Sequence, residues 1–133
     1  CLHALVDKLD MKFTLILLMV LSPLAAFSQD NLHYWDEGEK RLKTQKVEGA
    51  LVNKACAKRP EECQALKALS KDPKNIPKDD SVRAGNPALK TCKGLGGESI
   101  VAKDKESRDS YEFCRFSDGT MIDAWYLHKK VSE

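Results

Sequence analysis

Five cysteines are the side chains with the widest chemical range in this sequence, and they stand at positions 1, 56, 63, 92 and 114. A cysteine thiolate can attack as a nucleophile or bind a metal, and two cysteines can form a disulfide. Structural zinc sites usually take pairs of ligands separated by about two to four residues. Here six residues separate Cys56 from Cys63, and 21 separate Cys92 from Cys114. Neither interval fits a zinc site or the Cys-x-x-Cys redox motif, so we interpret these cysteines as structural disulfides.

Residues 11–28 are typical of a secretory signal peptide. A cationic start at Lys12 precedes a mainly apolar run from residue 13 to residue 21, and small residues occupy positions 26 and 28. This order of features predicts an export signal that is cleaved after Ser28. The alternative is a membrane anchor, but a spanning helix needs about 20 apolar residues and this run is shorter. The sequence therefore predicts a periplasmic or secreted protein.

Residues 1–10 precede the first methionine, and we interpret them as upstream sequence or a wrongly placed start. The predicted mature chain, residues 29–133, keeps four of the five cysteines. An even number fits disulfides in an oxidising compartment, and four cysteines allow three pairings. Basic and acidic residues number 22 and 20 in the full sequence, and the two signs alternate. We expect no nucleic-acid partner, because nucleic-acid-binding domains usually carry a clustered basic face.

The predicted mature chain offers few residues for catalysis. Hydrolysis by a serine or cysteine needs a histidine base, and only His33 and His128 are present, near opposite ends. Asp118 and Asp123 could form a carboxylate pair, but Asp118 already has a sufficient role in an Asp-Gly turn. The sequence therefore predicts a protein that is not an enzyme, with no cofactor and no metal site.

The first part of the mature chain, residues 29–70, is predicted to form a helical hairpin. Acidic residues precede basic ones by four positions, a spacing that stabilises helices. Pro60 ends the first helix and can open the second, which places Cys56 and Cys63 on either side of the break. The acid–base pairs are Asp36/Lys40, Glu37/Arg41 and Glu39/Lys43.

The rest of the chain is predicted to form a linker and a small second unit. Residues 71–85 contain two prolines and no apolar periodicity, which indicates a linker. Residues 86–133 are predicted to form a small α+β unit, in which one short helix precedes a three-stranded antiparallel sheet. A core of this size is marginal, so a disulfide would add substantially to its stability. The expected elements are a helix that begins at Pro87, strands over residues 99–103, 110–116 and 121–127, and a two-residue turn at Asp118 and Gly119.

The second unit carries a set of landmarks in a characteristic order and spacing. They are Asn86-Pro87-Ala88, Cys92, Gly96-Gly97, Cys114-Arg115-Phe116, Asp118-Gly119 and Trp125. In these landmarks, about residues 86–130 resemble a small bacterial envelope domain that has no settled function and is often labelled a haemolysin. That family usually has two further cysteines after its Asp-Gly turn, whereas here Ile122 stands at the first of those positions and no cysteine follows Trp125.

The resemblance also implies a disulfide pairing. If the two missing cysteines of the family bond to each other, the remaining pair here is Cys92 with Cys114, which leaves Cys56 for Cys63. A bond between Cys92 and Cys114 should contribute about 3 kcal/mol by loop-closure estimates. The haemolysin label does not imply membrane lysis, because the predicted helix over residues 36–58 lacks a broad apolar face.

The function expected from these observations is an exported module that binds a protein or another cell-envelope component. One alternative is an inhibitor of a secreted or periplasmic hydrolase, such as a protease or lysozyme, since a preorganised loop reduces the entropic cost of binding. Another is an enzyme whose site is completed by oligomerisation. The candidate contact residues are Arg108 in the loop over residues 104–109, the strand face of Tyr111, Phe113 and Arg115, and the edge near Trp125 and Tyr126.

Overall fold

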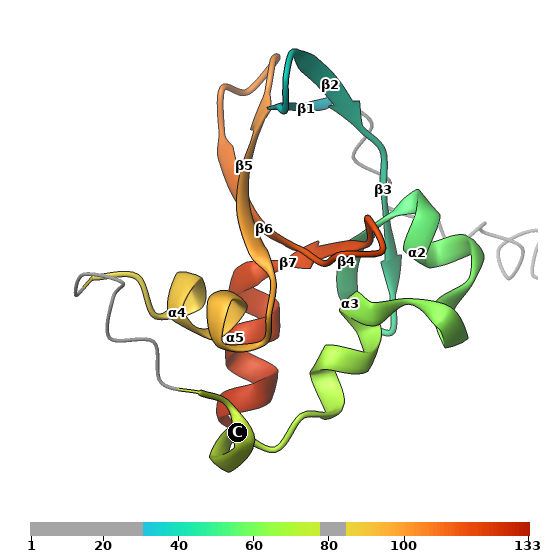
Figure 1. Ribbon diagram of the computed structural model, residues 1–133. Helices are drawn as coiled ribbons and strands as arrows, with labels where there is room; N and C mark the ends of the chain where they lie inside the picture. Colours follow the sequence, from blue (N-terminus) through green and yellow to red (C-terminus); the bar gives the residue numbers. More distant parts are fainter. Residues whose placement is uncertain (1–30, 78–84) are drawn as a thin grey trace, which may run out of the picture.

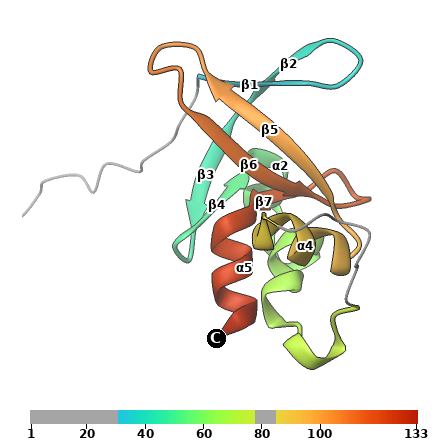
Figure 2. The ribbon, with the colours of Figure 1, turned by 90° about the vertical axis from the view of Figure 1, so that its left-hand side faces the viewer.

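A computed structural model describes residues 31–77 and 85–133 (Figures 1 and 2). The predicted signal peptide and the segment before it lie outside the described residues, as does part of the predicted linker. Seven antiparallel strands form a single sheet in the order β2-β1-β5-β6-β7-β4-β3. The strands are β1 (Leu32–Trp35), β2 (Glu39–Leu42), β3 (Thr44–Val47), β4 (Ala50–Asn53), β5 (Glu98–Asp104), β6 (Ser110–Arg115) and β7 (Met121–Asp123).

Short helices accompany the sheet. Within the described residues no helix is long and apolar enough to cross a membrane. The α-helices are α2 (Lys54–Lys58), α3 (Gln64–Lys67), α4 (Pro87–Gly94) and α5 (Ala124–Ser132), and the 3-10 turns are η1 (Pro60–Glu62), η2 (Ala68–Ser70) and η3 (Pro73–Asn75).

The predicted N-terminal helical hairpin is wrong, because its first half forms β1 to β4. Buried Leu42 and Thr44 alternate with exposed neighbours, which is the period of a strand. Glu48 and Gly49 both have positive φ angles, 51° and 87°, and make the two-residue turn between β3 and β4. Sheet pairing therefore overrides the helix-like spacing of acids and bases. Pro60 does separate two short helices, α2 and α3, as predicted.

The sheet curls because one chain segment supplies both of its ends. Only Lys43 separates β2 from β3, although these strands stand at opposite ends of the strand order. The carbonyl oxygen of Lys43 accepts a hydrogen bond from the N–H of Lys54 at 3.0 Å. The result is a half-barrel, which Figure 1 shows as a ring of strands. The predicted three-stranded sheet is thus only the centre, β5-β6-β7, and the N-terminal hairpins flank it on both sides.

Two apolar clusters pack on the two faces of the curled sheet. The inner cluster joins buried residues from β2 through β7 in the strand order, and half-buried Leu51 of β4 packs against it. The second cluster lies between the sheet and the helices, which gather beside β4 and β7 in Figure 2. Phe113 belongs to the inner cluster and Cys114 to the second, so the predicted alternation along β6 is confirmed. The buried residues of the inner cluster are Leu32, Leu42, Ile100, Ala102, Phe113 and Met121.

The third predicted strand of the C-terminal unit, over residues 121–127, is wrong beyond its third residue. The Asp123 carboxylate accepts a hydrogen bond from the N–H of Tyr126 at 2.9 Å, which caps α5. Ala124, Leu127 and Val131 then lie buried on one face of that helix. Their spacing has the period of a helix and not that of a strand.

Both predicted disulfides are present. Cys56 bonds to Cys63 with a Cα–Cα distance of 5.1 Å, and Cys92 bonds to Cys114 with a Cα–Cα distance of 5.5 Å. All four side chains are buried in the cluster between sheet and helices. The first bond joins α2 to the start of α3, and the second joins α4 to β6. Each disulfide therefore fixes a helix within the core.

Gly97 packs directly against the Cys92–Cys114 disulfide. A Cβ atom at this position would lie 2.9 Å from the Cys92 sulfur and closer still to the Cys114 sulfur. We predict that Gly97→Ala lowers the free energy of unfolding by about 1–3 kcal/mol through overpacking. Urea denaturation measures this loss. The loss should shrink in the Cys92→Ala, Cys114→Ala background, where both sulfurs are gone, and an equal loss in both backgrounds would refute this cause.

Candidate functional site

The strand face predicted as a contact surface points into the half-barrel. Phe113 is fully buried, and Tyr111 is half-buried against the same inner cluster. A partner cannot reach the Phe113 side chain without opening the sheet. Its burial places Phe113 in the core.

Arg115 lies at one end of the barrel and is held by two carboxylates. Its guanidinium donates to Asp36 and to Glu98, each at 2.8 Å. The bonds to Glu98 and Asp36 raise the pKa of Arg115, and the Arg115 bond, with a second from Lys40, lowers the pKa of Asp36. Arg115 therefore ties the β1–β2 turn to the paired strands β5 and β6. Because two carboxylates already accept from its guanidinium, Arg115 has fewer N–H groups left to donate to a partner.

The predicted edge near Trp125 and Tyr126 lies on α5. The Tyr126 hydroxyl donates to the carbonyl oxygen of Glu48 at 3.1 Å, which holds the β3–β4 turn against the helix. Trp125 is 50% exposed and meets His128 edge to face, with ring centroids 6.3 Å apart. His128 Nδ1 lies 2.8 Å from the Thr91 hydroxyl on α4. Tyr126 and His128 thus join elements of the fold, and Trp125 keeps an accessible ring face.

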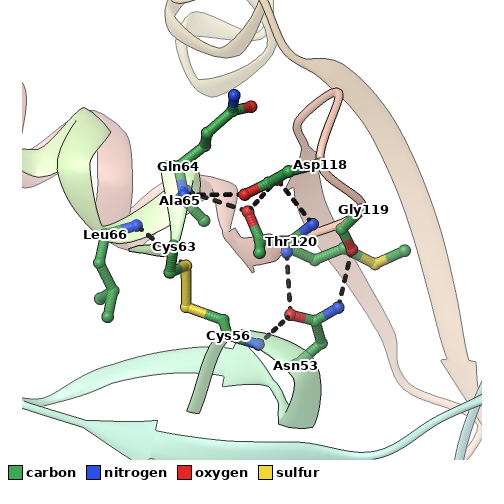
Figure 3. The surroundings of a disulfide bond; sticks show 10 residues. Asn53, Cys56, Cys63, Gln64, Ala65, Leu66, Asp118, Gly119 and Thr120 are labelled. Atoms are coloured by element: carbon green, nitrogen blue, oxygen red, sulfur yellow. Dashed lines mark hydrogen bonds between the residues drawn. A yellow bond between two sulfur atoms is a disulfide. The ribbon is translucent and has the colours of Figure 1, made fainter. Parts of the chain in front are cut away.

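Asp118 and Gly119 form the predicted turn, and this turn also holds α3 (Figure 3). One Asp118 carboxylate oxygen accepts from the N–H of Gln64 at 3.0 Å. The other accepts from the Thr120 N–H at 3.0 Å and from its hydroxyl at 2.6 Å. The Thr120 hydroxyl oxygen in turn accepts from the N–H of Ala65 at 3.1 Å. The turn therefore serves as an external cap for a helix far away in sequence.

Asn53 completes the same junction from β4. Its side-chain oxygen accepts from the N–H groups of Cys56, at 3.3 Å, and Met121, at 3.1 Å. Its amide nitrogen donates to the carbonyl oxygen of Gly119 at 2.9 Å (Figure 3). Asn53 and Asp118 thus join the N-terminal and C-terminal halves of the chain beside the Cys56–Cys63 disulfide. We assign this junction a structural role.

The hydrogen bonds of Asp118 predict an acid-sensitive contribution to stability. Burial alone would raise the pKa of Asp118, but the bonds from Thr120 and Gln64 outweigh burial and lower it below its usual value of 3.8. A lowered pKa means that the contribution is complete above that value and is lost as the pH falls through the pKa of the folded state. We predict that Asp118→Asn lowers the free energy of unfolding by about 1 kcal/mol at neutral pH.

Urea denaturation across a pH series tests the role of Asp118. The deficit of Asp118→Asn relative to the unmodified protein should shrink as the pH falls below the usual aspartate pKa of 3.8. Glu106→Gln, a change at an exposed carboxylate in the 104–109 loop, is the matched control and should show little deficit. A deficit for Asp118→Asn that stays constant down to acid pH would contradict the assignment.

The loop over residues 104–109 is shaped by its own hydrogen bonds. The Asp104 carboxylate accepts from the N–H groups of Glu106, at 2.8 Å, and Ser107, at 3.1 Å. The Asp104 N–H donates to the carbonyl oxygen of Asp109 at 2.9 Å, and Arg108 has a φ angle of 64°. These bonds fix a compact turn between β5 and β6 that presents the Arg108 side chain at the surface.

The outer face of β1 and β5 carries an aromatic surface that the sequence analysis missed. Trp35 is 76% exposed and Val101 is 49% exposed, and both border an open hollow of about 570 Å³. We call this surface the β1–β5 face. It lies on the opposite face of these strands from the inner cluster, and Figure 2 shows β1 and β5 at the end of the half-barrel away from the helices. The residues that line it are His33, Tyr34, Trp35, Glu39, Val101, Lys103, Asp104, Lys105, Arg108 and Ser110.

Acids and bases on this face differ in how they are paired. Glu39 binds Lys105 at 2.7 Å, and that bond lowers the pKa of Glu39. One oxygen of the Asp104 carboxylate, Oδ1, accepts from two backbone N–H groups of its loop. Lys103 and Arg108, in contrast, have no ion pair with any residue in the described ranges. The face therefore offers free cationic donors beside an exposed indole ring.

The residues expected to make contacts are thus only partly assembled on one surface. Of the predicted contact residues, Arg108 borders the β1–β5 face, and Trp125 lies on α5 elsewhere in the fold. Trp35 was missed because it falls in the segment predicted as helical. The sequence signal that could have identified it is the turn-forming pair Asp36 and Gly38 directly after Trp35, which would have ended a strand at the tryptophan.

Comparison with known proteins finds one family that is similar to part of the chain. Residues 83–130 match the family described as "Domain of unknown function (DUF333)". No curated protein and no solved structure matches the chain. The matched residues include α4, β5, β6 and β7, whereas β1 to β4 precede them. The C-terminal part of the chain is thus similar to a domain family of unknown function, and the β1–β5 face combines one strand from that part with one from outside it.

Proposed function

We propose that this protein is an exported, non-enzymatic module that binds a protein partner through the β1–β5 face. The observation that carries the proposal is Trp35, a large apolar side chain that is 76% exposed on a sheet face and borders a hollow. Tryptophan and arginine are enriched among the residues that dominate binding energy in protein interfaces. Trp35 and Arg108 border the same hollow, so one interface could bury both.

Export is supported by the two buried disulfides and by the signal-like residues 11–28. Disulfides form and persist in oxidising compartments, such as a bacterial periplasm or the extracellular space. We therefore place the partner there, as a secreted protein or a protein of the cell envelope. The loop over residues 104–109 borders the same hollow as Trp35, and its own hydrogen bonds already fix its backbone. Such a preformed loop loses less conformational entropy on binding.

Two tryptophan variants test the proposal in a matched way. Trp35→Ala should reduce the recovery of the partner from an extracytoplasmic extract by at least about tenfold, the scale of a strong interface residue. Trp125→Ala removes the other exposed tryptophan, on α5, and should leave recovery unchanged. Circular dichroism confirms that both variants are folded. Equal recovery by the unmodified protein and by folded Trp35→Ala would refute the proposed surface.

A further inference from the structure

We infer that the partner of the β1–β5 face presents acidic side chains around an apolar one. This inference rests on the proposed function and adds the chemical class of the partner. It follows from the unequal pairing of charges on the face. Its carboxylates, those of Glu39 and Asp104, already accept from donors of this chain, whereas Lys103 and Arg108 have no ion pair within the described ranges.

The strand register places the free cations beside the apolar part of the face. His33 pairs with Lys103, and Lys103 pairs with Ser110, so these three side chains form one row across β1, β5 and β6. Trp35 follows His33 by two residues on β1, and Val101 precedes Lys103 by two residues on β5. Both side chains therefore lie on the same face as that row and next to it. An apolar centre therefore adjoins a row of hydrogen-bond donors.

That arrangement matches the usual anatomy of a protein interface. The apolar centre excludes water, and charged groups at its rim set the orientation and accelerate association. A carboxylate placed over Lys103 or Arg108 gains an ion pair without breaking one inside this chain. A lysine placed there would meet the like charges of Lys103 and Arg108. Charge complementarity thus selects an acidic partner.

An anionic membrane is a less suitable occupant than an acidic protein. Trp35 is followed by Asp36 and exposed Glu37, and Glu39 lies opposite Trp35 on β2. A bilayer that accepted the indole ring would bring its negative surface against these carboxylates. A protein can place individual carboxylates over the cations and avoid Glu37, so we assign the face to a protein.

Two defined peptides test the inference by nuclear magnetic resonance of the isotope-labelled protein. The probe is the peptide Glu-Glu-Leu-Phe-Glu-Glu, and its control is Gln-Gln-Leu-Phe-Gln-Gln. The acidic peptide should shift amide resonances of β1, β5 and the 104–109 loop, and it should bind at least about fivefold more tightly than its control. Added salt should weaken the binding of the acidic peptide more than that of its control, because salt screens the interactions between exposed charges.

Charge reversal identifies the residues responsible. The variant Lys103→Glu, Arg108→Glu should abolish the preference for the acidic peptide, whereas Lys129→Glu, Lys130→Glu on α5 should preserve it. Vesicles of phosphatidylglycerol and phosphatidylcholine form the other arm of the experiment. The inference is overturned if neither peptide shifts the face, if both peptides bind equally, or if only the anionic vesicles bind.

The outcomes that would refute this inference differ from those that would refute the proposed function. If recovery of the natural partner depends on Trp35 but is insensitive to charge reversal at Lys103 and Arg108, the face still binds a protein and the acidic partner is excluded. If recovery does not depend on Trp35, the proposed function itself fails.

Discussion

Replacing Phe113 with alanine should lower the free energy of unfolding by about 3–5 kcal/mol, the range for deleting a buried aromatic ring. Phe113 is fully buried and is the largest of the completely inaccessible side chains in the described residues. It packs against residues from β1, β2, β5 and β7, so the ring fills the interior of the half-barrel. Urea or thermal unfolding measures the loss. Since small domains have a total stability of about 5–15 kcal/mol, this variant should be close to unfolding.

Two controls separate a core role from a binding role for Phe113. Phe113→Leu keeps most of the apolar volume and should lose clearly less stability than the alanine variant. Trp35→Ala removes an even larger ring from a surface position and should change stability little. If Phe113→Ala unfolded at the same urea concentration as the unmodified protein, the ring could not lie in the core.

Removing the Cys92–Cys114 disulfide is the second change with a large expected effect. These cysteines are 22 residues apart in sequence, and opening such a loop costs about 3 kcal/mol through the entropy gained by the unfolded chain. Both sulfurs are also buried, so the double variant Cys92→Ala, Cys114→Ala loses core contacts. We expect a decrease of at least about 3 kcal/mol in the free energy of unfolding, measured by urea denaturation.

The Cys56–Cys63 disulfide provides the matched comparison. Its cysteines are seven residues apart, and the same estimate gives about 2.5 kcal/mol for the Cys56→Ala, Cys63→Ala variant. The longer loop should therefore be the more costly one to open. A loss of less than 1 kcal/mol, on the scale of an ordinary surface change, for the Cys92–Cys114 pair would show that this bond does not restrain the unfolded chain.

The C-terminal half was largely predictable because its signals are local. Asn86 caps α4 and Pro87 opens it, and the Asp118-Gly119 turn follows β6 as expected. The prediction of a strand over residues 121–127 was wrong because the aromatic pair Trp125 and Tyr126 favoured a strand, and this outweighed two signals of a helix. Asp123 is a typical helix cap, and Leu127 and Val131 have helical spacing.

The N-terminal half could not be predicted because its strands depend on partners far away in sequence. Charged pairs such as Asp36/Lys40 have helical spacing, and the ion pair does form, at 3.2 Å. In the structure that pair joins the β1–β2 turn, at Asp36, to strand β2, at Lys40, and Arg115 also binds Asp36. The turn at Glu48-Gly49 lacks the Asn or Asp that usually marks such hairpins. No local pattern reveals that β5 and β7 will supply the missing strand neighbours.

The candidate site was missed for the same reason. Arg108 was identified because charged loops are exposed whatever the fold. The exposure of Trp35 depends on which face of β1 it occupies, and a strand's faces are set by register. Once residues 29–70 were interpreted as helical, no surface containing both Trp35 and Arg108 could be inferred. The two come together only through the pairing of β1 with β5.

The interleaved strand order also has a consequence for the order of folding. The hairpins β1–β2 and β3–β4 can each form locally, but Leu32 also pairs with Asp104 and Val52 with Ile122, so each hairpin gains its second neighbour only from strands far along the chain. Pairing across such distances is slow, because a long loop must close first. Cys56 and Cys63 are seven residues apart and can meet through a short loop, whereas Cys92 and Cys114 are 22 residues apart and must close a longer one, so we expect the first disulfide to form earlier in the oxidising compartment.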